Sequence, residues 1–160
     1  MIFDQPDESE YVGPPADAEM IRRAEDVLQV RLPKSYVDLV LAQNGGLLRN
    51  RCFPTEFPTS WAPDHMCVDV IWGVGGTWGV DVMSPSMIAE WRYPEIGVVL
   101  GITPSGGHDT VMLDYSGSGP LGEPSVSYVD EDRVPRRIAD SFADFLHGLV
   151  SCRTYGDDAD

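Results

Sequence analysis

The sequence has no long apolar run, few cysteines and a single lysine. No segment approaches the roughly 18 uninterrupted apolar residues of a membrane-spanning helix, so we expect no membrane span. The first residues contain no basic region followed by an apolar run, so we expect no secretion signal. The cysteines Cys52, Cys67 and Cys152 are odd in number and widely spaced, which predicts reduced thiols in the cytoplasm rather than a disulfide framework or a zinc motif.

Basic residues are scarce, and they are rarest in the middle of the chain. The sequence has 26 acidic and 11 basic residues, which gives a net charge of −15. Between Cys52 and Asp132 the only basic residue is Arg92, against twelve acidic residues, so this segment carries −11. Phosphate binding requires clustered Lys and Arg, so the charge argues against nucleic acid and anionic membranes as direct partners. It favours a basic partner protein, although solubility alone explains an acidic surface equally well.

The length predicts one domain with loose ends. A globular chain of 160 residues buries about two-thirds of the surface that its unfolded form exposes, so it needs no disulfide or metal to fold. Residues 1–16 are acidic and contain three prolines, which predicts an extended or weakly ordered arm. We expect a single domain over residues 17–152 and a short acidic tail over residues 153–160.

Helical patterns are clearest at the two ends of this domain. Asp17 is a suitable N-cap, and apolar residues follow it at helical spacing through Leu28. A second helix begins near Pro33 and stops at Asn44-Gly45-Gly46, whose glycines can adopt the left-handed conformation of a helix end. After Ser141, helical spacing predicts a closing amphipathic helix with the apolar residues Phe142, Phe145, Leu146, Leu149 and Val150.

Short strands are predicted between these helices, over residues 67–72, 98–102, 110–115 and 125–129. Apolar and polar residues alternate in 110–115, which predicts a strand with one solvent-facing side. Residues 47–63 predict an irregular connection, and residues 84–91 one or two helical turns. Helices segregated from sequential strands predict an α+β fold: an N-terminal helix pair, an antiparallel sheet of about four to six strands and a closing C-terminal helix.

Three segments resemble the SUKH superfamily, which groups the yeast Smi/Knr regulators of cell-wall assembly, bacterial Syd and many toxin immunity proteins. Residues 21–46 are similar to the family's opening helix pair, with Leu32-Pro33, Tyr36 and Asn44-Gly45-Gly46 in matching places. Residues 107–115 resemble the strand with a Leu-Asp core, and residues 127–130 with 141–146 resemble the final strand and its S-F-x-x-F-L helix. The likeness covers about residues 17–150, and it implies a non-enzymatic protein-binding domain.

No motif in the sequence predicts catalysis or a cofactor. Ser105, His108 and Asp109 fall on one predicted tight turn, where a nucleophile, a base and an orienting acid rarely align. The glycines of residues 73–79 are spaced unlike a dinucleotide-binding loop. His65 and Cys67 could join His108 and Asp109 around a metal, but paired metal-binding motifs are lacking. We therefore expect no catalytic residue, no cofactor and no metal ligand.

The remaining prediction is a protein-binding surface that combines tryptophans with acids. All four tryptophans lie in the segment that is poor in basic residues, and we expect two of them to be buried. Aromatic anchors beside carboxylates suit a basic partner. The predicted contact residues are Asp64, Asp69, Trp72, Trp78, Asp81, Asp109, Asp130, Glu131 and Asp132.

The family resemblance implies the kind of partner. Immunity members are commonly encoded with polymorphic toxins, many of them nucleases, whose basic surfaces would match an acidic inhibitor. We therefore expect a cytoplasmic monomer that binds and occludes a toxin domain. One alternative is a regulatory or scaffolding domain like the cell-wall and secretion-associated members, and a weaker one is an inhibitor that mimics nucleic acid.

Overall fold

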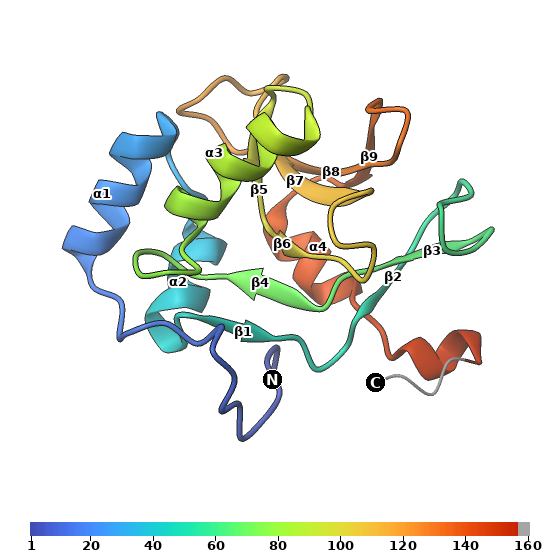
Figure 1. Cartoon of the computed structure of the whole chain (residues 1–160), viewed down its shortest axis with the longest axis horizontal. Coiled ribbons are helices and arrows are strands. Elements are labelled where there is room, and N and C mark those ends of the chain that lie inside the picture. Colours follow the sequence, from blue (N-terminus) through green and yellow to red (C-terminus); the bar gives the residue numbers. More distant parts are fainter. Residues whose placement is uncertain (157–160) are drawn as a thin grey trace.

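The computed structural model describes residues 1–156, in which helices and antiparallel strands are combined (Figure 1). The helices are α1 (Ala18–Leu28), α2 (Lys34–Ala42), α3 (Val80–Trp91), α4 (Phe142–Gly148) and the 3₁₀ helix η1 (Cys152–Tyr155). The strands are β1 (Gly45–Leu47), β2 (Cys52–Pro54), β3 (His65–Cys67), β4 (Val70–Trp72), β5 (Gly97–Val99), β6 (Gly101–Ile102), β7 (Thr110–Asp114), β8 (Ser125–Val129) and β9 (Pro135–Ala139). Of the predicted tail, residues 157–160 lie outside the described residues.

The strands of this described part form three antiparallel sheets. A four-stranded sheet runs in the order β5-β7-β8-β9, a three-stranded sheet in the order β1-β4-β6, and β2 pairs with β3 alone. β7 and β8 are in register over five residue pairs, from Thr110 opposite Val129 to Asp114 opposite Ser125. The helix pair at the start, the sequential antiparallel strands and the closing helix confirm the predicted α+β class.

Two predicted strands are wrong in their extent, because the chain changes sheet within each of them. Residues 67–72 are divided between β3 and β4, and residues 98–102 are divided between β5 and β6 at Leu100. Leu100 remains bonded on both sides: its N–H donates to Val111, and its carbonyl accepts from Trp72. The break therefore joins two sheets without leaving buried backbone groups unpaired, and a period-two pattern does not reveal it.

Other elements differ from the sequence prediction in burial or length. β7 is buried on both faces, rather than on one, because residues 55–64 also pack over this sheet and Phe57 lies against Tyr128. The region expected to be irregular contains β2, and β9 was missed because its sequence, Pro-Arg-Arg-Ile-Ala, is that of a polar edge strand. α3 begins at Val80, before the predicted turn, and holds Pro85 in its interior.

The junction between α2 and β1 depends on Asn44 rather than on a glycine cap. α2 ends at Gln43 in an extended conformation, while Gly45 has φ +86° and lies in β1, so the predicted left-handed glycine end is wrong. The buried Asn44 amide donates to the carbonyls of Pro14 and Val74 at 2.8 and 2.9 Å and accepts from the Val74 N–H at 2.7 Å. One side chain thus joins the N-terminal arm, α2 and the end of β4.

A continuous aromatic and aliphatic core lies between the helices and the sheets. Tyr36 on α2 is fully buried, and its hydroxyl donates to the Trp72 carbonyl at 2.7 Å. The Tyr36 ring meets Phe142 of α4 edge-on at 5.5 Å, and Phe142 lies beside Phe145. The two ends of the domain therefore pack against each other through one aromatic cluster.

The N-terminal arm contacts this core. Phe3 is 4% exposed, and the Asp4 N–H donates to Leu47 at 2.9 Å. The Asp7 carboxylate accepts from the N–H groups of Leu47 and Ser9. Burial acts to raise the pKa of Asp7, but the hydrogen bonds outweigh it and hold that pKa below its usual value. The division into arm, domain and tail remains a prediction.

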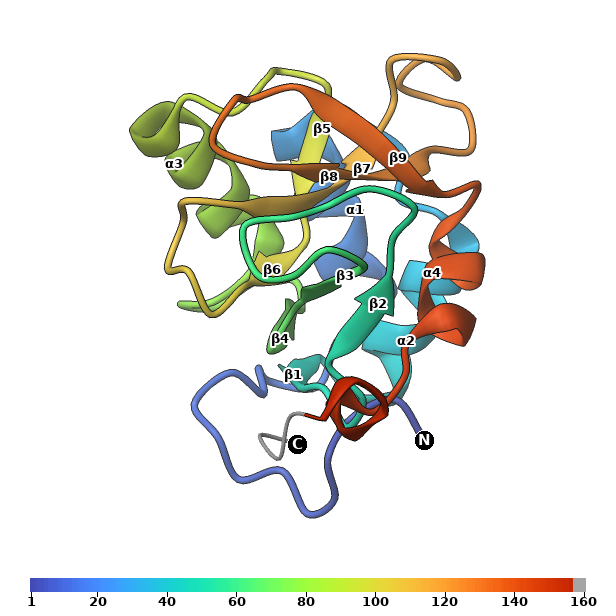
Figure 2. The ribbon, with the colours of Figure 1, turned by 90° about the vertical axis from the view of Figure 1, so that its right-hand side faces the viewer.

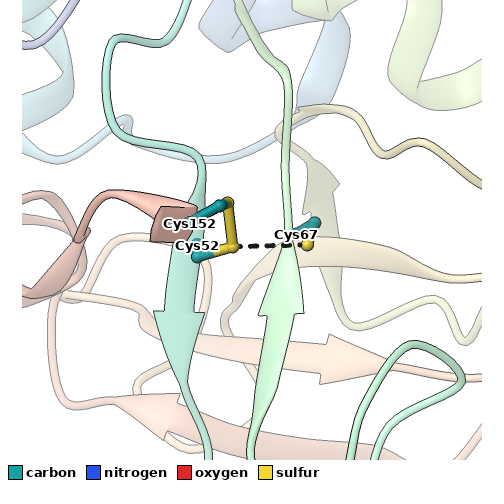
Figure 3. Close-up of side chains that lie close together, drawn as sticks. All are labelled: Cys52, Cys67 and Cys152. Carbon is teal, nitrogen blue, oxygen red and sulfur yellow. Dashed lines mark hydrogen bonds between the residues drawn. A yellow bond between two sulfur atoms is a disulfide. The ribbon is translucent and has the colours of Figure 1, made fainter. Parts of the chain in front are cut away.

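The expectation of three reduced thiols is wrong for two of the cysteines. Cys52 on β2 is bonded to Cys152 on η1 in a disulfide that closes a sequence separation of 100 residues (Figure 3). The backbones of Cys52 and Val150 pair beside it, which brings the C-terminal segment onto β2. Sequence spacing could not show this proximity, because it is created by the tertiary fold.

In residues 1–156 we find no helix whose length and apolar character would let it cross a bilayer.

Asn44→Ala should destabilise the fold by about 2–4 kcal/mol, because it leaves the buried carbonyl and N–H of Val74 and the part-buried carbonyl of Pro14 without their partner. Urea unfolding under non-reducing conditions measures this free energy. Asn50→Ala is the matched control, since Asn50 is exposed, and its effect should stay within about 0.5 kcal/mol. Equal unfolding free energies for the two variants would contradict the role given to Asn44.

Candidate functional site

The loop between β2 and β3, residues 55–64, lies beside β8 and β9 (Figure 2). We call it the β2–β3 loop. Its shape is set internally: the Thr55 N–H donates to Asp64 at 2.9 Å, and the Thr59 N–H donates to Ala62 at 2.8 Å. The Thr59 hydroxyl also donates to the His65 carbonyl at 2.6 Å. These bonds give a ten-residue loop a defined course over the sheet.

A buried carboxylate, Asp109, attaches this loop to the body. Asp109 is 1% exposed, and its Oδ1 accepts from the hydroxyls of Thr103 and Ser105, each at 2.6 Å. Its Oδ2 accepts from the indole Nε1 of Trp61 at 2.8 Å and from the Tyr128 hydroxyl at 2.6 Å. All four side-chain donors are neutral, so dipoles rather than an ion pair satisfy the carboxylate. Burial, and then the bond to Asp109, raise the pKa of Tyr128, which therefore keeps the proton it donates.

A second attachment joins the loop to the turn after β8. The Ser60 N–H donates to Asp130 at 3.0 Å, and the Ser60 hydroxyl donates to the same carboxylate. Trp61, the next residue, is 41% exposed although its indole N–H is held by Asp109. The loop therefore presents an aromatic ring to solvent in a fixed orientation.

A hollow of about 380 Å³ lies between the loop and this turn. It is lined by Phe57, Pro58, Ser60, Asp130, Glu131, Asp132 and Arg136, and we call it the acidic hollow. Three carboxylates and one guanidinium leave it with a formal charge of −2. Phe57 and Pro58 are its apolar lining residues, and the Arg136 guanidinium lies over the ring of Phe57 at 5.9 Å.

Nearby arginines neutralise part of the charge of the turn. Arg136 pairs with Asp132 at 2.7 Å, and the hydrogen bond from Arg136 holds the pKa of Asp132 below its usual value. Arg133 does not line the hollow, and it donates to the carbonyls of Trp91, His108 and Asp130. Glu131 is exposed at the rim, where its charge faces solvent.

The structure brings only some of the nine predicted contact residues together. Asp130, Glu131 and Asp132 line the acidic hollow, and Asp64 is exposed at the other end of the β2–β3 loop. Trp72 and Asp109 are each 1% exposed, which removes them from any contact surface and corrects the prediction for these two residues.

The other three predicted contact residues lie elsewhere. Trp78 packs edge-on against Tyr11 of the arm at 5.1 Å, and Asp81 accepts from the Gly75 N–H at 2.9 Å. Figure 1 shows this segment, which leads into α3, on the opposite side of the molecule from the β2–β3 loop. Asp69 is partly buried between β3 and β4. The nine residues therefore do not form one surface.

Trp61 is the residue that the sequence analysis did not select. Of the four tryptophans, Trp72 is buried and Trp78 and Trp91 are partly buried, whereas Trp61 is exposed. A usable signal was present, because Trp61 stands within a proline-rich stretch that predicted irregular, surface-lying chain.

The candidate catalytic residues are not arranged for catalysis. Ser105 donates directly to Asp109, while the His108 ring lies edge-on to Trp91 at 5.2 Å. This is not the order in which a base lies between a nucleophile and an orienting acid. The glycine-rich segment before α3 is held by Asn44, which accepts from the Val74 N–H at 2.7 Å.

A larger groove, of about 770 Å³, lies between α1, α3 and β5, away from the acidic hollow. Its walls are mainly apolar and include Leu28, Ile88 and Tyr115. Its size exceeds that of the acidic hollow, but it contains one of the twelve acids of the base-poor segment, Glu95, whereas the hollow contains three and adjoins the loop that carries Trp61. The charge and aromatic signals of the sequence therefore point to the smaller site.

Comparison with known proteins gives one family match. No curated protein matches the sequence. A model of the SUKH_6 family, described as SMI1-KNR4 cell-wall, matches residues 18–146, from the first residue of α1 into α4. The matched region contains the helix pair, all three sheets and the acidic hollow. Because the match covers most of the chain, the protein belongs to the SUKH family.

Proposed function

We propose that this SUKH domain is a non-enzymatic protein-binding module that neutralises a basic toxin through Trp61 and the acidic hollow. The observation that carries the proposal is the half-exposed Trp61 ring, held by Asp109, in a loop in which the adjacent residue, Ser60, lines the acidic hollow and bonds to Asp130. The partner would be a toxin domain, with a nuclease as the class that best matches the charge. Nucleic acid and membranes would not be direct partners.

Trp61 has the properties of an interface anchor. Tryptophan is enriched among residues that dominate binding energies, because one rigid ring buries a large area. The bond from its indole N–H to Asp109 already restricts the ring in the free protein. Binding would therefore lose little side-chain entropy, which is the cost that weakens many exposed anchors.

The acidic hollow suits a basic side chain from the partner. An arginine entering it would meet the three carboxylates and the ring of Phe57 that line it. Arg136 already occupies this kind of position over Phe57, in a pair with Asp132. An incoming arginine would share or replace that pairing, and the overall charge of −15 would accelerate the encounter.

The proposed setting is the cytoplasm, with the free protein a monomer. A second candidate function is favoured by the family description, which names cell-wall proteins of the SMI1-KNR4 type. In that case the same surface would bind a cellular partner constitutively. A toxin partner should arrest growth when produced alone and should not when produced together with this protein, whereas a regulatory partner should not be toxic.

Charge reversal at the hollow should weaken binding selectively. The partner is first isolated from native lysate at low and moderate salt, and its affinity for purified variants is then measured by calorimetry. Glu131→Lys should weaken binding about 10-fold or more and reduce its salt dependence. The change replaces an exposed carboxylate with a positive charge, which would repel the basic partner. Trp61→Ala should cost about 2 kcal/mol or more.

Glu123→Lys is the matched control for this experiment. Glu123 is also exposed, but it precedes β8 whereas Glu131 follows it, so the same charge change occurs at the opposite end of the strand. The proposal requires Glu123→Lys to bind like the wild type. It is wrong if both lysine variants lose affinity equally, or if Trp61→Ala has no effect.

Asp109→Asn should loosen the β2–β3 loop without abolishing the fold. The introduced amide side chain would turn an NH₂ group toward hydroxyl or indole N–H donors that now bond to the Asp109 carboxylate. We expect this to lower the free energy of unfolding by about 1–3 kcal/mol. Hydrogen exchange should then accelerate in residues 57–62, and partner affinity should fall. Asp114→Asn is the control: Asp114 is also buried and bonded to hydroxyls, but it lies at the far end of β7. Faster exchange of the loop in both variants would argue against a specific positioning role for Asp109.

A further inference from the structure

The three cysteines of the chain meet at one buried point behind the β2–β3 hairpin (Figure 3). Cys52 lies on β2, Cys67 on β3 and Cys152 on η1, and their exposed fractions are 0%, 9% and 3%. The three Sγ atoms lie within 4.8 Å of one another. Cys52 and Cys152 are joined by the disulfide, and the Sγ of Cys67 is 3.4 Å from that of Cys52.

Backbone pairing holds these three positions together independently of the disulfide. Cys52 stands directly opposite Cys67 in the β2–β3 register. Both backbone groups of Cys52 bond to Val150: its N–H donates at 3.1 Å, and its carbonyl accepts at 2.8 Å. Cys52 and Cys67 are thus a non-hydrogen-bonded pair, in which side chains approach most closely, and Cys152 follows Val150 by two residues. The cluster is therefore preformed and should survive reduction of the bond.

The sulfur atoms form a triangle rather than a line. Exchange of Cys67 into the disulfide, with Cys152 as the leaving group, requires the three atoms to be nearly collinear. A bond of about 2.0 Å continued by the 3.4 Å contact would then separate Cys67 and Cys152 by more than 5 Å. The observed limit of 4.8 Å excludes that arrangement. A triangle is instead the shape in which three ligands share one ion.

We propose that Cys52, Cys67 and Cys152, once reduced, bind a thiophilic divalent metal ion of the Zn²⁺ class. Ligands at about 2.3 Å in a tetrahedron lie about 3.8 Å apart. The Sγ atoms of Cys52 and Cys67 are already 3.4 Å apart, and reduction must let the Sγ atoms of Cys52 and Cys152 separate by about 2 Å. Three buried thiolates without a cation would be costly, and the ion supplies the compensating charge. A water molecule takes the fourth position.

The chemistry of loading has two balanced steps. A dithiol reductant transfers two electrons and two protons to the Cys52–Cys152 bond, which becomes two thiols while the reductant becomes a disulfide. The metal ion then displaces one proton from each of the three thiols, and three metal–sulfur bonds form. A small-molecule disulfide reverses the sequence: it accepts two electrons from the thiolates of Cys52 and Cys152 and takes up two protons to become two thiols, while the Cys52–Cys152 bond re-forms. Cys67 then takes up a proton, and the ion, left without its ligands, is released. The site would therefore hold either a disulfide or a metal, and it does not depend on the proposed partner.

Cobalt(II) titration of the full-length protein tests this site. Co²⁺ bound by thiolates gives a charge-transfer absorption band that can be followed, whereas bound Zn²⁺ gives no such signal. Untagged protein is reduced with a phosphine and kept without oxygen. One Co²⁺ per chain should bind with the spectrum of thiolate ligation, and Zn²⁺ should displace it. The same titration without reduction should give no thiolate band, since two of the three ligands are then in the disulfide.

Cys67→Ser is the decisive variant, because it removes one ligand and leaves the Cys52–Cys152 pair available for folding. Its affinity for Co²⁺ should fall by more than about 100-fold, since loss of an outer partner of a ligand alone costs 10–100-fold. His147→Ala, which removes an exposed histidine of α4, should bind as the wild type does. Circular dichroism of the unreduced variants establishes that each is folded. The proposal is overturned if reduced wild-type protein shows no thiolate band, or if Cys67→Ser binds Co²⁺ equally well.

Discussion

The carboxylate of Asp109 is the interaction on which the candidate surface depends. It lies just before β7, yet it receives side-chain hydrogen bonds from the turn after β6, from β8 and from the β2–β3 loop. A buried carboxylate is stable only when its acceptor sites are filled, so the four donors and the acid require one another. If any of these segments moves, an unpaired charge or donor is left in the interior. This mutual requirement is what places Trp61 at the surface with its indole N–H pointing inward.

This arrangement holds the β2–β3 loop in place while leaving the Trp61 ring partly exposed. A loop that carries an anchor ring must be held firmly, but apolar packing of the ring would hide it. Polar attachments at Trp61 and Ser60 hold the loop from beneath and leave one side of the ring exposed. Apolar packing is provided by other side chains: Phe57 lies against Tyr128, and an aromatic cluster joins α2 to α4. Different side chains of neighbouring segments thus form the core packing and the exposed surface of the loop.

Local sequence patterns predicted the features that depend on neighbouring residues, namely helix caps, strands and helices, but few of the contacts between distant segments. The cap at Asp17, the strands around Thr110 and Ser125, and the closing helix after Ser141 all follow from short-range spacing, and the structure contains them. The changes of sheet near Leu100, the disulfide and the burial of Asp109 depend on segments far apart in the chain. The charge pattern located the acids of the turn after β8, but not which tryptophan lies in the loop bonded to that turn. Trp72 ends a predicted strand and Trp61 lies in a proline-rich irregular stretch, and the structure buries the first and exposes the second.

The β2–β3 loop is attached through very few residues, which has an evolutionary consequence. Within the β2–β3 loop, the side-chain bonds to Asp109 and Asp130 come from two adjacent residues, Trp61 and Ser60. Exposed positions such as Glu56 and Pro58 can change without disturbing either bond. Point changes in one hairpin could therefore alter the exposed surface of the loop, while the cost to folding stays small. In that sense the scaffold is suited to rapid diversification.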